Sequence, residues 1–337
     1  MSLEIAPFAP VAADAQLIAE CYQVSSAAFR TAFPDRPFSS YEAFSDRLLS
    51  PSCLMGPQRF WAARSDGHVV GIATVTLPEH ENRDFALVDV RVDPVQHRQG
   101  IGRALLRGVL PLCRAEQRTA LAAQGVMAGS AGERWALALG FVKVQEFVLQ
   151  SLTVPDVDPR LWQVAAPAGF RVEQWTGSAP GSLVAPYARA RTAIVDAPTG
   201  ASEFHFPEWT VERVRRHEAE LRERGDEQHV VVAVHEETGT VAGLTELMVS
   251  AARPTVGYQL DTAVLPAFRG RGLGRFVKAR MMLVLTADRP ELTRVAINTA
   301  SDNGHMIRVN HQVGYRTDET VADLEACLDT LEAALSS

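Results

Sequence analysis

The sequence has few cysteines and no clustered metal ligands, and both deficits exclude a class of protein. The four cysteines among 337 residues are Cys21, Cys53, Cys113 and Cys327. They are widely spaced and contain no CxxC pair, which excludes a disulfide framework and indicates free thiols in a reducing compartment. None of the nine histidines stands in an HExxH or comparable spacing, so the sequence predicts no metal site.

Long hydrophobic runs and excess positive charge are also missing. No run of about 18 apolar residues occurs, and the N-terminus lacks the basic and apolar regions of a signal peptide. The formal net charge is −7, which gives no overall attraction to nucleic acids or anionic membranes. We therefore expect a cytoplasmic protein with neither as a partner. A chain with 47% hydrophobic and 22% charged residues is globular in composition, and its length suffices for two domains.

An internal repeat divides the chain into two copies. The glycine-rich turn PVQHRQGIG at residues 94–102 recurs as PAFRGRGLG at residues 266–274. A second marker, LALGF ending at Phe141, recurs as HQVGY ending at Tyr315. The two markers keep their order, at offsets of 172 and 174 residues, about half the chain. This arrangement predicts two copies of one domain.

A proline-bearing segment without sustained periodicity separates the copies, and we read it as a linker. The predicted domains are residues 1–153 and 169–337, joined by residues 154–168. Each copy alternates strand-like and helical segments, which predicts a mixed α/β fold. The tail from residue 321 stays open at this stage, because its leucines have helical spacing while the matching part of the first copy has a strand pattern.

The elements expected within each copy follow one order. Each has a first strand, a helix, a hairpin, a further strand, the glycine turn, a long helix, a strand and a short helix. The hairpins turn at Asp66-Gly67 and Thr238-Gly239, where positive φ is cheap. The expected ranges after the first strands near residues 5 and 171 are helices 13–29 and 183–195, hairpins 59–77 and 229–249, strands 85–93 and 256–265, helices 101–116 and 272–286, and strands 119–127 and 294–300.

The glycine turns predict an anion site. A strand that leads through glycines into a helix exposes backbone N–H groups at the positive end of the helix dipole. A Walker A loop needs Gly-Lys-Ser/Thr, and a dinucleotide fingerprint needs GxGxxG early in a βαβ unit, and neither fits here. The alternative is a tight connection without a ligand. Two turns in matching context, with Arg269, Arg271 and Arg275 on the second, favour a diphosphate.

At these residues the sequence resembles the GNAT acetyltransferase superfamily, whose acyl-CoA loop reads Arg/Gln-x-x-Gly-x-Gly/Ala after a fourth strand. Residues 269–274 match that pattern fully, whereas His97 stands at its first position in the first copy. The layout is similar to that of tandem GNAT proteins such as mycothiol synthase. The string INTASDNGHMIRVNHQVGY, residues 297–315, resembles the C-terminal signature of actinobacterial tandem GNAT proteins.

The resemblance implies two tandem GNAT folds, acetyl-CoA as co-substrate and no metal. It also implies a splayed pair of fourth and fifth strands that admits the pantetheine arm, with backbone amides at the end of strand four that bind the thioester carbonyl. Preorganised N–H donors of this kind stabilise the tetrahedral oxyanion of acyl transfer. The cofactor-binding residues carried over are Ala263, Val264, Arg269, Gly270, Arg271, Gly272, Leu273, Gly274, Arg275 and Asn303 in the second copy, and Val92, Arg98, Gln99, Gly100 and Gly102 in the first.

Two carboxylates are candidates for the base that accepts the proton of the amine. Glu246 and Asp261 lie inside apolar strand-like runs, where an unpaired charge is costly unless a site uses it. The alternative for each is a strand residue that faces solvent. We give Glu246 a slight preference, because the first copy lacks a counterpart while it retains Asp89 near the other position.

The residue expected to protonate the leaving thiolate differs from that of the family. Asn310 stands at the position of the family's tyrosine, and an amide could only hydrogen-bond the sulfur. The alternatives are that the thiolate leaves unassisted, or that His305, His311 or Tyr258 supplies the proton. For each, a purely structural role is the alternative.

The second copy is predicted to be the active one. It has Asn303 and Asn310 where the first copy has Gly129 and Ala136. The predicted function is an acetyl-CoA-dependent N-acetyltransferase that acts on a small-molecule amine, with a degenerate first copy. Alternatives are a CoA-binding sensor or partner module without turnover, and a transferase with a longer acyl donor or an O-acceptor. The sequence leaves a monomer and a homodimer open.

Overall fold

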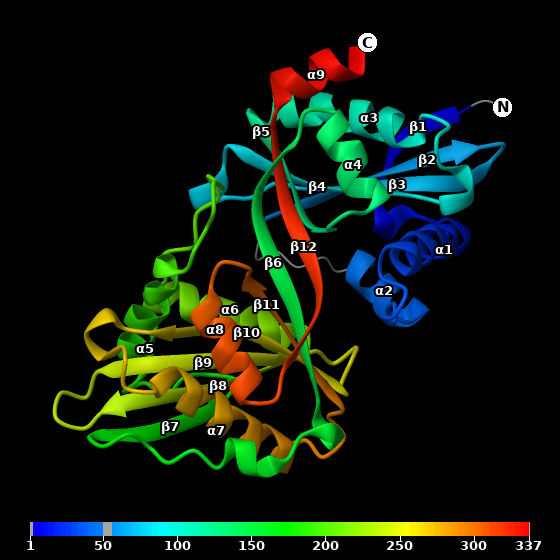
Figure 1. The fold of residues 1–337 in the computed structure, drawn as a ribbon. Coiled ribbons are helices and arrows are strands. Elements are labelled where there is room, and N and C mark those ends of the chain that lie inside the picture. The colour runs from blue at the N-terminus through cyan, green and yellow to red at the C-terminus, as the bar shows by residue number, and fades with distance from the viewer. Residues whose placement is uncertain (1–2, 50–55, 337) are drawn as a thin grey trace. The chain divides into compact units, whose positions relative to one another are not determined.

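The computed structural model describes residues 3–49 and 56–336, and it forms two compact units (Figure 1). Unit 1 comprises the chain to Glu146, residues 200–204 and the tail from Val321. Unit 2 comprises residues 147–199 and 205–320. The expected mixed α/β class is confirmed. The compact units are assembled differently from the contiguous ranges expected from the sequence, because the last strands of the two copies are exchanged.

Unit 1 is built on a mixed sheet in the order β1-β2-β3-β4-β5-β12. Neighbouring strands are antiparallel, except that β4 and β5 are parallel. Its strands are β1 (Leu3–Phe8), β2 (Gln58–Ser65), β3 (His68–Thr76), β4 (Phe85–Val92), β5 (Ala120–Met127) and β12 (Arg316–Cys327). Its helices are α1 (Ala15–Ala32), α2 (Tyr41–Leu49), α3 (Ile101–Ala115), α4 (Ala131–Ala138) and α9 (Leu328–Ser336). The predicted hairpin turn is confirmed, since Asp66 and Gly67 have φ of 51° and 86°.

Unit 2 repeats the arrangement with the order β6-β11-β10-β9-β8-β7. Only β10 and β11 are parallel neighbours. Its strands are β6 (Val142–Thr153), β7 (Phe170–Thr176), β8 (Glu227–His235), β9 (Val241–Val249), β10 (Val256–Val264) and β11 (Arg294–Ala300). Its helices are α5 (Val184–Arg191), α6 (Val211–Glu223), α7 (Leu273–Asp288) and α8 (Gly304–Gln312).

The exchange of last strands is visible in the pairing registers. Residues 147–153 of β6 pair with β11 of unit 2, although β6 ends the first copy. Residues 321–327 of β12 pair with β5 of unit 1. The open question about the tail is thereby resolved: a strand runs to Cys327 and a helix follows.

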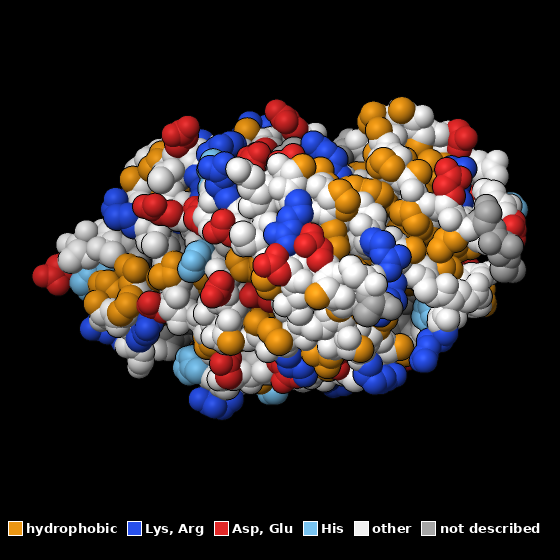
Figure 2. All heavy atoms as spheres, turned by 90° about the horizontal axis from the view of Figure 1, so that it is seen from above, with side chains coloured by type: hydrophobic (Ala, Val, Ile, Leu, Met, Phe, Trp, Pro, Cys, Tyr) orange, Lys and Arg blue, Asp and Glu red, His pale blue; other side chains and the backbone are white. Residues whose placement is uncertain are grey.

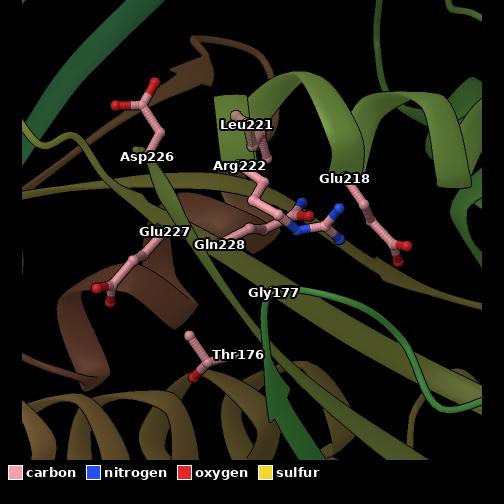
Figure 3. A pocket seen from close by; sticks show the side chains of 8 residues that line it. All are labelled: Thr176, Gly177, Glu218, Leu221, Arg222, Asp226, Glu227 and Gln228. Atoms are coloured by element: carbon pink, nitrogen blue, oxygen red, sulfur yellow. The ribbon is translucent and has the colours of Figure 1, made fainter. Parts of the chain in front are cut away.

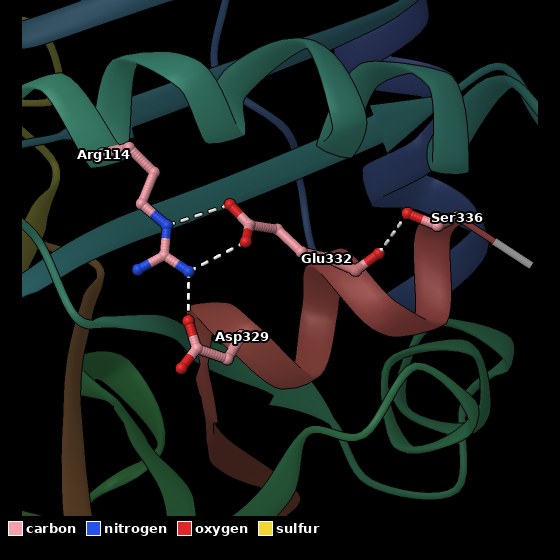
Figure 4. Close-up of polar contacts among 4 residues, drawn as sticks. All are labelled: Arg114, Asp329, Glu332 and Ser336. Atoms are coloured by element: carbon pink, nitrogen blue, oxygen red, sulfur yellow. Dashed lines mark hydrogen bonds and ion pairs between the residues drawn. The ribbon is translucent and has the colours of Figure 1, made fainter.

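The C-terminal helix α9 is held on unit 1 by apolar and charged contacts. Leu328, Leu331 and Leu335 are buried in the core of that unit. Figure 4 shows Arg114 of α3 bound to both carboxylate oxygens of Glu332 and to Asp329. Helical spacing brings the three leucines to one face, which explains the pattern seen in the sequence.

The strands of unit 2 bury alternate side chains in two cores. In β8, Val231 and Ala233 belong to the core that contains α7, whereas Val230, Val232 and Val234 belong to the core that contains α5 and α6. This alternation follows from the two-residue period of a strand. The sheet of unit 2 is therefore covered on both faces, and the face toward α5 and α6 carries the polar groups described below.

The segment read as a linker is irregular but packed. It contains two 3₁₀ turns, Val154–Asp156 and Pro159–Trp162. Trp162 is buried, and its indole Nε1 donates to the carbonyl oxygen of Val313 at 2.9 Å. Residues 154–168 thus form part of unit 2.

The structure also shows the state of the cysteines, the character of the helices and the distribution of surface charge. Cys21, Cys113 and Cys327 are free thiols, while Cys53 lies outside the described residues. Among helices of the described chain, none has the length and apolar content that crossing a bilayer requires. Figure 2 shows Lys and Arg side chains interspersed with Asp and Glu over the face in view.

Candidate active site

The fourth and fifth strands of each unit part after three paired residues. In unit 2, Val256–Tyr258 pair with Arg294–Ala296, and the rest of β10 has no partner in β11. In unit 1, Phe85–Leu87 pair with Ala120–Ala122 in the same way. The splay that the resemblance implied is confirmed in both units. It leaves the second half of each fourth strand with backbone groups that no fifth strand engages.

Only the fourth strand of unit 2 is bulged. The register of β10 against β9 shifts between Gln259 and Thr262, so that Leu260 and Asp261 together stand opposite the single residue Glu246 of β9. In unit 1, β4 pairs with β3 without a shift from Leu87 to Val92. A bulge frees backbone groups and redirects a side chain, and bulges are enriched beside active sites. This difference separates two units that otherwise share their topology.

The glycine turn of unit 2 ends in an open helix N-terminus. Gly270 and Gly272 have φ of 75° and 79°, and Gly272 is the N-cap of α7 without any side-chain cap. The first helical bond runs from Phe276 N to Gly272 O, so the amides before it have no partner within the helix. A methyl group built on Gly272 would meet no atom within 4 Å. The backbone here is accessible to an anion.

The arginines of the turn have different contacts. Arg269 donates from Nε to the carbonyl of Val264 at 3.1 Å and from Nη2 to Asp196 at 2.5 Å. The guanidinium carbon of Arg271 lies 5.7 Å from the ring centre of Phe268. Arg275 is exposed. Arg269 therefore ties the turn to the end of β10, and phosphate contacts by the three arginines stay a prediction.

The equivalent turn of unit 1 has the same backbone and a different filling. Gly100 has φ of 81°, and Nε2 of His97 lies 3.2 Å from the carbonyl oxygen of Val92, the contact that Arg269 makes in unit 2. Arg98 has φ of 67° where unit 2 has a glycine.

The first turn of α3 in unit 1 is also obstructed by a large side chain. A methyl group on Gly102 would lie 3.2 Å from the indole of Trp135, whereas one on Gly274 would come no closer than 3.9 Å to any atom. Trp135 belongs to α4 and packs on the core of unit 1. The indole therefore occupies space that is open in unit 2.

Glu246 is the centre of a buried polar cluster in unit 2. Its side chain is fully buried, and it accepts from Tyr187 Oη at 2.7 Å, Arg191 Nη2 at 2.8 Å and Gln228 Nε2 at 3.2 Å. Nε of Arg191 lies 2.8 Å from its other oxygen. Burial raises the pKa of Glu246 to about 7, against the opposing charge of Arg191. The alternative of a solvent-facing residue is wrong for Glu246.

Asp261 is half-buried at the bulge and makes no hydrogen bond or ion pair with a described residue. Burial raises its pKa, and the charge of Arg191 acts in the opposite direction. After burial and the opposing charge of Arg191, the charge of Asp261 also contributes to the raised pKa of Glu246. Of the two, Asp261 has free acceptor oxygens, whereas those of Glu246 are occupied.

Unit 1 has no such pair. Asp89, the residue nearest in position to Asp261, accepts from Arg91 Nε and Nη2 at 3.0 and 2.6 Å. Arg91 stands two residues further along the same strand, on the same face. The carboxylate of Asp89 is therefore neutralised by its own strand.

Asn310 lies in a second buried network. Its Nδ2 donates to Gln150 Oε1 at 2.7 Å and to Thr299 Oγ1 at 3.0 Å, and the residue is fully buried. Both amide hydrogens are therefore engaged, and a contact with a thiol sulfur stays a prediction. Asn303 caps α8, its Oδ1 accepting from Met306 N at 3.1 Å.

The other candidate proton donors have ordinary contacts. Tyr258 Oη accepts from Arg253 at 2.7 Å. Nε2 of His311 lies 3.1 Å from Thr317 Oγ1. The described structure brings none of these together with the Glu246 cluster.

Several residues of this site were not identified from the sequence. Tyr187, Arg191 and Gln228 are 18 to 59 residues from Glu246, and no motif marks them. A pocket of about 250 Å³ opens beside Gln228, between the end of β7, α6 and the start of β8 (Figure 3). It is lined by Thr176, Gly177, Glu218, Leu221, Arg222, Asp226, Glu227 and Gln228. Among the described residues no group of His, Cys, Asp and Glu could hold a metal ion.

A family model and two similar solved structures point to the same protein family. A sequence model of the acetyltransferase (GNAT) family matches residues 18–141 and 197–315. The chain is similar to a tandem GNAT protein from the clavulanic acid biosynthesis pathway, at 26% identity, with 97% of this chain and 99% of the other covered and a TM-score of 0.76. It also resembles a GCN5-related N-acetyltransferase from Sphaerobacter thermophilus, at 17% identity, with 97% and 96% covered and a TM-score of 0.74. Among curated protein sequences none matches significantly.

Proposed function

The chain belongs to the GNAT acetyltransferase family, hence to the acyltransferases, and on this premise we propose that unit 2 transfers the acetyl group of acetyl-CoA to the amine of a small molecule. Members of this family typically use acetyl-CoA and acetylate amines. The small-molecule acceptor and the restriction of activity to unit 2 are our proposals. The expected likeness to mycothiol synthase and the actinobacterial type stay predictions.

The observation that carries the assignment to unit 2 is the bulge in β10. It coincides with the splay and with an open helix N-terminus on the same strand-turn-helix segment. Unit 1 has the splay but pairs its fourth strand regularly, and Trp135 stands over the first turn of its helix. Among the described residues, the bulged fourth strand, the unobstructed first helical turn and the carboxylate without a partner therefore occur together in unit 2 and not in unit 1.

Each group has a role that its chemistry supports. The amides of residues 272–275 would hold the diphosphate of the cofactor at the N-terminus of α7. The amides of the second half of β10, including Ala263 and Val264, would face the thioester carbonyl and stabilise the oxyanion that forms there. The thioester then lies next to the bulge, beside the carboxylate of Asp261.

Asp261 is the better placed base. An amine must lose a proton to attack the thioester, and Asp261 has free oxygens and a raised pKa near the point of attack. Glu246 is enclosed by its three donors, so its oxygens are not available to an amine. This assignment reverses the slight preference for Glu246 that the sequence supported.

A second function, binding of CoA without turnover, is favoured by one observation. Asn310 replaces the family's phenolic proton donor, and its amide hydrogens are engaged inside the protein. Such a protein would bind acetyl-CoA and release no thiol with any acceptor. Nothing in the described structure favours a longer acyl group or an O-acceptor.

Thiol release from acetyl-CoA with a panel of primary amines tests the proposal. We expect acceptor-dependent release, lowered about 10²–10⁴-fold in Asp261→Asn as for loss of a general base. The matched control is Asp89→Asn in unit 1, which we expect to retain the wild-type rate. Acetyl-CoA binding without release for any amine would establish the binding function instead.

A further inference from the structure

Buried nitrogen atoms without acceptors gather on the α5 and α6 face of unit 2. The atoms are Arg191 Nη1, Trp209 Nε1, Trp175 Nε1 and His217 Nδ1, and none has a hydrogen-bond partner among the described residues. Arg191 and His217 are only 4% and 7% exposed. Arginine and indole N–H groups can only donate, so the protein leaves a surplus of buried donors. Such groups in a native protein call for an occupant, either water or a ligand.

Ring contacts join these atoms into one cluster. The guanidinium carbon of Arg191 lies 3.2 Å from the ring centre of Trp209 and 5.7 Å from that of Tyr187. Trp209 contacts His217 at 5.8 Å, and Trp175 contacts Tyr187 at 5.2 Å between ring centres. The unused Nη1 of Arg191 and the N–H of Trp209 therefore belong to two groups that are stacked on each other.

The opposite charge lies on the other side of the same guanidinium. Arg191 and Glu246 neutralise each other through contacts at 2.8 Å. Asp261 also feels the charge of Arg191 and has no hydrogen-bond partner of its own. Around Arg191 the protein thus presents unpaired donors and one unpaired carboxylate.

A ligand that complements both features carries an anion and an amine. We propose that the acceptor of unit 2 is an amino acid or a similarly compact zwitterion. Its carboxylate would bind Nη1 of Arg191 and Nε1 of Trp209, and its ammonium would lie beside Asp261. This inference rests on the proposed function, since it places the amine at the carboxylate next to the bulge.

Free amino acids and their α-carboxamides are the probes that separate carboxylate recognition from amine recognition. Acetyl transfer from acetyl-CoA is followed with the full-length protein, and kcat/KM is compared on the high-pH plateau so that the different amine pKa values do not enter. We expect the acids to exceed the amides about tenfold or more, as one charge-assisted hydrogen bond provides.

Trp209→Phe deletes the indole N–H and keeps the stacked ring. We expect kcat/KM for the acids to fall about tenfold with that for the amides unchanged, so that the preference collapses. Trp175→Phe, which removes the donor that does not contact Arg191, is the matched control and should keep the preference. Arg191→Lys, which retains the charge but not the planar fork, should also reduce the ratio, and it serves if Trp209→Phe does not fold.

Carboxamides acetylated as well as the acids would overturn the inference and leave the proposed function intact. So would the absence of transfer to either class in a protein that binds acetyl-CoA, because the donors then hold only water. Failure to bind acetyl-CoA would overturn the proposed function together with the inference.

Discussion

Replacing Glu246 by glutamine should chiefly lower the stability of unit 2, whereas replacing Asp261 by asparagine should chiefly lower the rate of acetyl transfer. Above pH 7, where the carboxyl of Glu246 is ionised, Glu246→Gln removes the charge that compensates the buried Arg191. Breaking a buried pair on one side costs about 3–5 kcal/mol, and because glutamine still accepts one hydrogen bond we expect about 3 kcal/mol. In a folding unit of about 150–250 residues each kcal/mol lowers the midpoint by roughly 2–4 °C, so the unfolding midpoint of unit 2 should fall by roughly 6–12 °C.

Asp261→Asn should leave the midpoint unchanged or raise it slightly. Asp261 has no hydrogen bond to lose. Burial raises the pKa of Glu246 from 4.5 to about 7, and the charge of Asp261 adds to that rise. Without that repulsion the pKa of Glu246 falls. The rate of acetyl transfer should nevertheless drop about 10²–10⁴-fold, and the rise of kcat/KM with pH that reflects Asp261 should disappear.

Thermal unfolding followed by circular dichroism, together with pH profiles of kcat/KM, gives both quantities for each variant. Asp89→Asn serves as the control for loss of a strand carboxylate, because Asp89 is paired with Arg91 at the surface. Two results would refute the division of roles between the two residues. One is an Asp261→Asn protein whose unfolding midpoint falls together with its activity. The other is a Glu246→Gln protein that keeps the wild-type midpoint and has no activity.

Two further predictions concern packing in unit 2. Lys278 is buried and has no hydrogen-bond partner among the described residues, and burial lowers its pKa from 10.5 to about 7. Because the unfolded chain binds this proton more tightly, stability is lost as the pH falls from 10.5 to 7. Lys278→Met should therefore raise the unfolding midpoint more at pH 7 than at pH 10, and an equal rise at both pH values would exclude this cause. Gly314 has φ of 103°, and a methyl group there would lie 2.8 Å from Val157, so Gly314→Ala should lower the free energy of unfolding by more than about 1 kcal/mol. In the control Gly239→Ala the methyl group meets no atom within 4 Å, so the loss measured by chemical denaturation should be smaller. Equal losses in the two variants would refute the packing argument.

The repeated unit and its glycine turn were predictable because they depend on local sequence. Gly272 and Gly100 adopt left-handed backbone at the start of a helix in both units, and glycine is favoured there. The hairpins and long helices follow from apolar periodicity in the same way. These features need no knowledge of distant residues.

The exchange of last strands was not predictable from pattern. The alternation of β6 and β12 suits either sheet, and pairing across 140 residues or more leaves no local signal. The sequence therefore assigned residues 147–153 to the first copy, whereas they complete the sheet of unit 2.

The partners of the catalytic candidates were also hidden. Glu246 was recognised as an unusual carboxylate within an apolar strand, but Tyr187 and Arg191 are ordinary residues of a helix in the sequence. The bulge at Asp261 has no proline or glycine beside it to mark it. Only three-dimensional packing distinguishes the occupied carboxylate from the free one.

The measurement that tests the central claim most directly is calorimetric titration of the full-length protein with acetyl-CoA. We predict one site per chain, lost in Gly272→Ala, where a methyl group enters the open space before the amides of α7. Gly100→Ala, which imposes the same backbone strain in unit 1 at φ of 81°, should bind like wild type. Two sites per chain, or a loss of binding in Gly100→Ala with Gly272→Ala unaffected, would contradict the assignment of acyl transfer to unit 2.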